Sequence, residues 1–201
     1  MRTLLLMLFL PVFCFGQASQ NDPPERQVIQ DTIQGTSMQL KDGRVVFKKA
    51  YSSSLKKEAL MDKLSALLSL IKSFRFNEGT YQSGEQVIGK LFRHKINADR
   101  YGGVYLIGAL SALTDPLNAM VLVQVKDFKY QVVITEISFG EVYADSLKRT
   151  HYNDVMLEKY VTRNNASKLK SGKSNVKLLQ SIDQEFSDLF NLQKSNLAAD
   201  F

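Results

Sequence analysis

The residues with the most evident chemistry begin with a single thiol near the N-terminus. Cys14 is the only cysteine of the 201 residues, and it lies in the stretch FLPVFCFGQASQ, from Phe9 to Gln20. A cysteine in this place is a lipid attachment point, a structural thiol, or part of a segment that is removed. The residues around it discriminate between these three uses.

Residues 1–16 have the layout of a secretory signal peptide. Arg2 gives a basic start, a short apolar run extends from Leu4 to Phe15, and Gly16 is a small residue at its end. The run is much shorter than the roughly 20 apolar residues that a membrane-spanning helix needs. The sequence therefore predicts export to the periplasm or the exterior, cleavage after Gly16, and no transmembrane anchor after processing.

Cleavage after Gly16 makes Gln17 the first residue and discards Cys14. The mature chain then has no cysteine, which excludes disulfides, thiolate metal sites and cysteine nucleophiles. The alternative is a lipoprotein in which Cys14 becomes the acylated N-terminus. We favour cleavage, because lipoprotein processing prefers a small residue before the cysteine and Phe13 is bulky.

Two histidines are the next candidates, His94 in FRHKI and His151 in RTHYND. A zinc site draws several ligands from His, Cys and carboxylates, and neither histidine has an obvious cluster. We expect His94 on the solvent face of a strand and His151 in a solvated loop, although Asp154 has a spacing from which it could orient His151 as a general base. No metal and no cofactor are predicted.

A hydrolase would need an acid and a base that the fold brings together. The pool of candidates is Glu85, Asp127, Glu136, His151 and Asp154. Their spacing does not pair them, and no nucleophile, base and orienting group can be assembled from the sequence. No catalytic residue is therefore predicted.

Residues 163–177 carry basic side chains and no acidic one. The predicted contacts for an anion or a partner are Arg163, Lys168, Lys170, Lys173 and Lys177. Their positive field attracts lipid phosphates, acidic glycans or carboxylates, and the alternative is a solvated basic loop. Gly172-Lys173-Ser174 looks like the end of a phosphate-binding loop, but Ser167 occupies the place of its first glycine, so nucleotide binding is not expected.

Two hairpins are predicted from turn residues that lie between alternating apolar runs. The first has Asp42-Gly43 at its turn, because a type I′ turn needs positive φ at both central residues. Its predicted pairs are Leu40 with Val45 and Met38 with Phe47. The second has its turn at Asp127-Phe128. Its predicted pairs are Val125 with Tyr130, Val123 with Val132 and Val121 with Ile134 on an apolar face, and Lys126 with Lys129 and Gln124 with Gln131 on a polar face.

Helical spacing appears twice. Residues 52–74 begin with serines that are available as N-cap acceptors, and their apolar positions are Leu60, Leu64, Leu67, Leu68, Ile71 and Phe74. Residues 175–192 have apolar positions at Leu179, Ile182, Phe186, Leu189 and Phe190. Residues 81–107 have extended character without a defined register. Residues 141–174 are expected to form a short helix around Tyr152, Val155, Met156 and Tyr160, followed by a polar loop.

Four motifs occur in a distinctive order within residues 40–192: DGRVVFKKAY, KKEAL at the start of the long helix, GEQVIGK and VQVKDFKYQVVIT. In this order they resemble the family called domain of unknown function 4468, which consists of exported bacterial proteins with a TATA-binding-protein-like (TBP-like) fold. The resemblance implies a curved antiparallel sheet with helices on one face, and no activity. The chain departs from the family at Phe128, where a turn glycine is usual. It also has Phe74 or Phe76 in place of an aromatic residue, often tryptophan, near the end of the long helix.

Nucleic acid is not an expected ligand, although the implied fold is that of a DNA-binding protein. A minor-groove saddle uses two such halves with apolar wedges between base steps, and this exported chain has one half at most. The formal net charge of +6 is also modest, and it is more consistent with solubility than with a nucleic-acid ligand.

The sequence thus predicts an α+β protein with a curved antiparallel sheet and a long and a C-terminal helix on one face. The predicted divisions are a signal peptide (1–16), a flexible or loosely docked leader rich in Gln, Asp and Pro (17–36), one domain (37–194) and a tail (195–201). The leading hypothesis is a non-enzymatic cell-envelope domain that binds a protein, glycan or lipid partner through its open sheet face or its basic segment. The alternatives are a hydrolase with an unrecognised acid/base site and a structural subunit of an envelope assembly.

Overall fold

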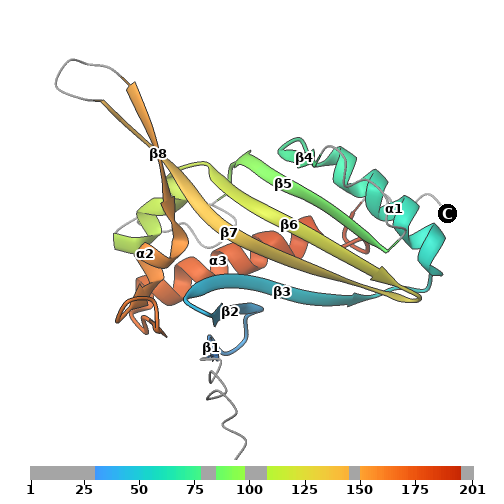
Figure 1. Ribbon diagram of the computed structural model, residues 1–201, viewed down its shortest axis with the longest axis horizontal. Helices are drawn as coiled ribbons and strands as arrows, with labels where there is room; N and C mark the ends of the chain where they lie inside the picture. The colour runs from blue at the N-terminus through green and yellow to red at the C-terminus, as the bar shows by residue number, and fades with distance from the viewer. Residues whose placement is uncertain (1–29, 78–84, 98–107, 145–149, 196–201) are drawn as a thin grey trace, which may run out of the picture.

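The computed structural model describes residues 30–77, 85–97, 108–144 and 150–195. The predicted signal peptide, with Cys14, lies outside the described residues. Within them, the chain forms one large antiparallel sheet with helices packed against it (Figure 1). The predicted α+β class is therefore confirmed.

The large sheet has eight strands in the described part of the chain, in the order β1-β2-β3-β7-β6-β5-β4, and β8 pairs with β7 outside this path. The strands are β1 (Gln30–Thr32), β2 (Met38–Lys41), β3 (Arg44–Ser52), β4 (Phe74–Phe76), β5 (Gln86–His94), β6 (Leu117–Lys126), β7 (Lys129–Ala144) and β8 (Thr150–Met156). A small second sheet pairs β9 (Thr162–Arg163) with β10 (Lys168–Leu169). The helices are α1 (Lys57–Leu70), α2 (Leu157–Val161), α3 (Lys173–Leu189) and the 3-10 helix η2 (Gly108–Thr114).

The first predicted hairpin is confirmed as β2–β3. Its register pairs Leu40 with Val45 and Met38 with Phe47. The turn residues Asp42 and Gly43 have φ angles of 50° and 75°, as a type I′ turn requires. β1 adds to the edge of this hairpin by pairing with β2. The end of the predicted leader, residues 30–32, is thus a strand, because its main chain completes the hydrogen bonds of a sheet edge.

The second predicted hairpin is confirmed as β6–β7, with Val125 opposite Tyr130 and Lys126 opposite Lys129. Asp127 and Phe128 form its two-residue turn. Phe128 takes the glycine position with a φ of 62°, a left-handed conformation that costs a residue with a Cβ about 1–2 kcal/mol. The departure from the family pattern therefore gives a strained turn and not a longer loop.

The core lies on one side of the sheet, where α1 and α3 pack. Inward side chains of the strands alternate with exposed or half-buried ones along β2, β3, β6 and β7. These inward side chains form one cluster with Leu60, Leu64 and Leu68 of α1 and with Ile182 and Phe186 of α3. In Figure 1, α3 runs behind β3, β7 and β6, so the viewer faces the opposite side of the sheet.

The start of α1 differs from the prediction. Its N-cap residue is Lys56, and no serine side chain caps the helix. Asp127 accepts a hydrogen bond from the main-chain N–H of Lys57 at 2.9 Å, through Oδ1, although it lies 70 residues away in the β6–β7 turn. A carboxylate at this end of a helix is also favoured by the helix dipole. Asp127 in the second hairpin turn therefore caps the helix, in place of the serines that were expected to do so.

Two predicted helical segments are partly strands. Phe74, expected at the end of the first helix, lies in β4, because α1 ends at Leu70. Tyr152, Val155 and Met156, expected in a short helix, lie in β8, where they pair with the end of β7. Tyr160 does lie in a helix, α2. The C-terminal helix is confirmed as α3.

Candidate functional site

His94 was expected on the solvent face of its strand, and this expectation is wrong. Val87, Gly89 and Leu91 of β5 are buried in alternation, which would place His94 outside. The register between β5 and β6 shifts between Leu91 and His94, and Arg93 has a φ of 51°. A β-bulge inserts one extra residue and so reverses the alternation beyond it. The bulge turns His94 to the helix side of the sheet, where it is buried.

The buried His94 links two other polar side chains that are distant in sequence. Its Nδ1 lies 2.8 Å from Oγ of Ser73, in the connection between α1 and β4. Its Nε2 lies 2.9 Å from Oε1 of Glu185, in α3. Only 11% of the side chain of His94 and 11% of that of Glu185 are exposed. Ser73, His94 and Glu185 form a hydrogen-bonded chain from the surface into the core, which we call the Ser–His–Glu chain.

The Ser–His–Glu chain borders a groove of about 1190 Å³ between the end of α1, the β5 bulge and the end of α3. Ser73 is half-buried there. Two large apolar side chains of the groove lining are unusually exposed, Leu70 at 66% and Phe92 at 49%. The remaining charged side chains of the lining are Lys72, Arg93, Lys95, Asp188 and Lys194. The groove thus combines a polar base with apolar and basic walls.

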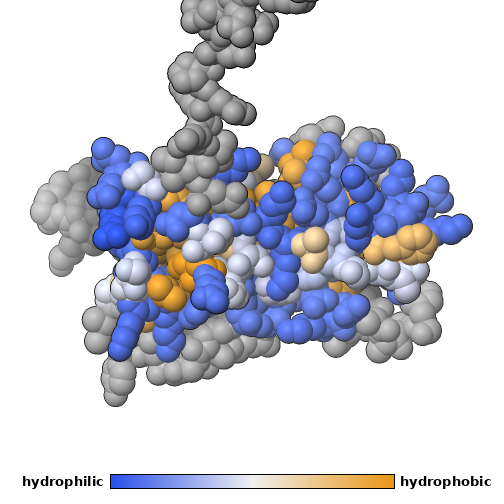
Figure 2. Space-filling view, turned by 90° about the horizontal axis from the view of Figure 1, so that it is seen from below, coloured by the Kyte–Doolittle hydropathy of each residue, from blue (hydrophilic) through white to orange (hydrophobic). Residues whose placement is uncertain are grey.

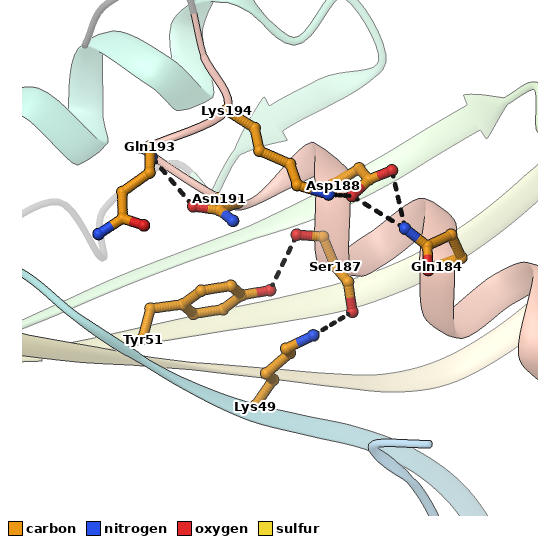
Figure 3. A network of polar contacts seen from close by, with 8 residues as sticks. All are labelled: Lys49, Tyr51, Gln184, Ser187, Asp188, Asn191, Gln193 and Lys194. Atoms are coloured by element: carbon orange, nitrogen blue, oxygen red, sulfur yellow. Dashed lines mark hydrogen bonds and ion pairs between the residues drawn. The ribbon is translucent and has the colours of Figure 1, made fainter. Parts of the chain in front are cut away.

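A second polar network fastens α3 to the sheet beside this groove (Figure 3). Tyr51 donates a hydrogen bond to the main-chain oxygen of Ser187 at 3.2 Å, and Nζ of Lys49 donates to Oγ of Ser187 at 2.7 Å. Asp188 forms an ion pair with Lys194 and accepts from the amide of Gln184. These contacts hold the helix that carries Glu185.

Two tyrosines, the buried Tyr130 and the half-buried Tyr51, complete the attachment of the C-terminal segment. Tyr130 donates to the main-chain oxygen of Phe190 at 2.9 Å and accepts from the N–H of Leu192 at 3.0 Å. Burial raises the pKa of Tyr130 to about 12. Burial is also the main reason why the pKa of Tyr51 lies well above its usual value, and the nearby Tyr130 raises it further. Both phenols therefore keep their protons at neutral pH and act as hydrogen-bonding groups.

The open face of the sheet, opposite the helices, is the second candidate site. Its centre is an apolar row of half-buried side chains, in which Ile88, Leu122 and Val133 lie side by side across β5, β6 and β7. The basic side chains at outward positions around this row are Lys41, Arg44, Lys48, Lys90, Lys126 and Lys129. Figure 2 shows the side of the molecule seen from below Figure 1, where hydrophilic residues predominate and apolar ones lie in separate areas.

Basic residues face each other directly at both hairpin ends of this open face. Lys41 pairs with Arg44 next to the first turn, and Lys126 pairs with Lys129 next to the second. Like charges directly opposite each other in an antiparallel pair are destabilising. An anion bound at either end would relieve this repulsion.

The candidate hydrolase residues whose side chains are described do not form one site. Glu136 and Asp154 line the same shallow depression, but no hydrogen bond joins them in the described part of the chain, and Asp154 accepts from Nδ2 of Asn118. Glu85 pairs with Lys57, and Asp127 caps α1. His151 was expected in a loop, and this expectation is wrong, because it lies in β8 opposite Tyr143 of β7. Its side chain is outside the described part of the structure.

The predicted basic segment falls on three elements. Arg163 of β9 pairs with Lys168 of β10. Nζ of Lys170 donates to the main-chain oxygen of Tyr160 at 2.9 Å, so this charge stabilises the end of α2. Lys173 and Lys177 lie in the first turns of α3, after the N-cap residue Gly172. The segment brings Arg163 and Lys168 together, and it uses Lys170 for structure.

Neither a metal-ligand cluster nor a membrane-spanning helix occurs within residues 30–77, 85–97, 108–144 and 150–195. No group of three or more His, Cys, Asp or Glu side chains in these ranges is placed to hold a metal ion. None of the helices there has the length and apolar character needed to cross a membrane.

Comparison with known proteins finds similarity to two solved structures. No family model and no curated protein matches the sequence. A TBP-like protein from Parabacteroides distasonis is similar in structure, with 12% identity and a TM-score of 0.48 over 77% of this chain and 96% of that one. A DUF4468 family protein from Bacteroides ovatus has 14% identity and a TM-score of 0.40 over 81% and 91%. The chain resembles this family and the TBP-like fold, as the sequence motifs indicate, and neither description names a ligand or an activity.

Proposed function

We propose that this protein is an exported cell-envelope domain that binds an anionic partner through the open face of its sheet. The observation that supports this most is the pairing of Lys41 with Arg44 and of Lys126 with Lys129 at the two hairpin ends. The fold retains this repulsion on a face that the helices of the described residues do not cover. A ligand with carboxylate, sulfate or phosphate groups would relieve it.

The apolar row between the basic ends adds a second contribution. Ile88, Leu122 and Val133 are half-buried on the open face, so a ligand would remove part of their surface from water. Each square ångström of apolar surface buried is worth about 25 cal/mol. An anionic protein segment with apolar residues, an acidic glycan with apolar sugar faces, and an anionic lipid share this chemistry.

Reversal of the paired charges should weaken anion binding. The variant Lys126→Glu with Lys129→Glu is expected to lose affinity by about tenfold or more, and wild-type affinity should fall as salt rises. Binding is measured by titration with an acidic peptide, an acidic polysaccharide and vesicles containing phosphatidylglycerol, which separates the three partner classes.

A matched control tests the basic segment of residues 163–177. Lys168→Glu with Lys173→Glu changes charge equally on two exposed residues that do not belong to either facing pair of the open face. We expect this variant to bind like the wild type. A loss confined to the Lys168 and Lys173 variant would move the binding site to the basic segment, and unchanged binding of both variants would refute an electrostatic site on the sheet.

Export has a separate test in the intact mass of the protein purified from its native cell envelope. We expect a chain that begins at Gln17, because Gly16 and the short apolar run before it fit signal peptidase. A diacylated or triacylated Cys14 would show a lipoprotein instead. A chain that retains Met1 in the cytosol would contradict export.

A further inference from the structure

The groove on the helix side of the sheet has a geometry that the proposed binding function does not use. We propose that the Ser–His–Glu chain is an acyl-transfer site, in which Ser73 is the nucleophile, His94 the general base and Glu185 the positioning residue. The substrate class is a carboxylic ester whose apolar part lies against Leu70 and Phe92. This inference does not depend on the open face.

The hydrogen bonds define the roles. An ionised Glu185 accepts from N–H of His94 at Nε2, with 2.9 Å between the heavy atoms. Nδ1 of the neutral imidazole is then left without a proton, and it accepts from the hydroxyl of Ser73 at 2.8 Å. A nucleophile, a base and a group that orients the base are the three parts of a serine hydrolase site, which is recognised by geometry and not by sequence order. The three residues come from three separate elements, as such sites usually do.

The two ends of the Ser–His–Glu chain differ in exposure, as an acyl-transfer reaction requires. Ser73 is half-buried and lines the groove, whereas His94 and Glu185 are buried. A nucleophile has to reach the substrate, and a buried carboxylate beside the histidine stabilises the imidazolium that forms. Leu70 and Phe92 expose apolar surface at the same groove. An exposed aliphatic and an exposed aromatic side chain next to a polar base suit an ester with an apolar group.

The groove also supplies donors for the negative charge that develops on the ester oxygen. Among the described residues, the main-chain N–H groups of Lys72 and Ser73 donate to no acceptor. Serine hydrolases use the N–H of the nucleophile itself together with a second N–H as an oxyanion hole. The charged side chains around the site, which also affect its pH dependence, are Lys72, Arg93, Lys95, Glu185, Asp188 and Lys194. Most of these are basic, which further favours an oxyanion.

The backbone beside the histidine is strained. Arg93 adopts a φ of 51°, and its N–H donates to Oδ1 of Asn118 at 2.8 Å. A residue with a Cβ in this region costs energy and persists where the surrounding structure requires it. The bulge is what turns His94 toward Ser73 and Glu185. The strain therefore positions the base.

The reaction has two balanced steps. Oγ of Ser73 attacks the ester carbonyl carbon while His94 takes the hydroxyl proton, and the tetrahedral intermediate collapses when the C–O bond to the leaving alcohol breaks and His94 returns the proton to that oxygen. Water then attacks the carbonyl carbon of the acyl-serine while His94 takes a proton from it. The bond from that carbon to Oγ of Ser73 breaks, His94 returns the proton to Oγ, and the carboxylic acid leaves. No redox partner and no cofactor are needed.

A fluorophosphonate probe tests the nucleophile in the full mature chain, because it phosphonylates an activated serine and releases fluoride. We expect the label on Ser73 by peptide mass spectrometry, and hydrolysis of p-nitrophenyl butyrate that is lost in Ser73→Ala. The matched control is Ser69→Ala, because Ser69 is exposed in α1 and its hydroxyl donates to the main-chain oxygen of Ser65. This control should label and hydrolyse like the wild type.

The base and the positioning residue need readouts that loss of folding would not mimic. His94→Gln is expected to reduce the labelling rate by about 100-fold or more at an unchanged circular dichroism spectrum. Glu185→Gln should shift the pH profile of labelling, and Glu185→Asp should restore part of the rate. Wild-type protein that is not labelled, or label that persists in Ser73→Ala, would overturn the proposal. We expect normal labelling of the Lys126→Glu and Lys129→Glu variant, which would show that the Ser73 site is independent of binding at the open face.

Discussion

Replacing Phe186 with alanine is expected to destabilise the fold by about 3–5 kcal/mol, the usual cost of removing a buried phenylalanine. Phe186 is fully buried. Its ring meets the ring of Phe47 edge to face, with 5.5 Å between centroids and 75° between planes. Since Phe47 lies in β3 and Phe186 in α3, this contact joins the helix layer to the sheet. The measurement is urea unfolding followed by circular dichroism.

The effect of Phe186→Ala should extend to the groove, because Glu185 is the neighbouring residue of α3. Gln180→Ala is the matched control, since Gln180 is exposed in the same helix and its replacement should change stability by no more than about 0.5 kcal/mol. A loss below about 1 kcal/mol for Phe186→Ala would mean that α3 does not depend on this contact.

The parts of the fold that the sequence predicts are those that local residues determine. Asp42-Gly43 and the alternating apolar residues on either side determine one hairpin, including its register. Alternation alone was enough for the second, although Phe128 is a poor turn residue. Local residues determine these hairpins because the paired residues are close in sequence. The register is also well defined, since a shift by one residue would move every apolar side chain to the wrong face of the sheet.

The Ser–His–Glu chain depends on tertiary structure, and the sequence does not reveal it. His94 is 21 residues from Ser73 and 91 from Glu185. Its orientation follows from one bulge, for which the sequence offers no glycine and no other marker. Strict alternation along β5 therefore gave the wrong face. The capping of α1 by Asp127 is a similar case. The serines near the start of the helix are plausible N-cap residues from the local sequence, whereas Asp127 is brought there by the tertiary fold.

The β5 strand that carries His94 also leads to the second large expected effect, at Gly89. A Cβ built on Gly89 would lie 2.3 Å from Cζ of Phe74 and 2.7 Å from the main-chain oxygen of Arg75. The ring is buried against the core, and the main-chain oxygen belongs to the neighbouring strand, β4. Neither can move without separating β4 from β5. We therefore expect Gly89→Ala to cost about 3 kcal/mol, at the upper end of overpacking effects.

Gly140→Ala is the matched control for Gly89→Ala, because Gly140 is also a buried glycine of the same sheet. A Cβ there would meet Asp154 and Pro116 at 3.6 Å, which is ordinary contact. We expect this control to be neutral or slightly stabilising, since alanine restricts the unfolded chain. Thermal unfolding of both variants gives the comparison.

Ser73 directly precedes β4, so the displacement of β4 in Gly89→Ala should also lengthen the hydrogen bond from Ser73 to His94 and slow labelling of Ser73. Equal stability of the two variants would show that β4 yields without cost, and that the position of Ser73 does not depend on close packing against Gly89.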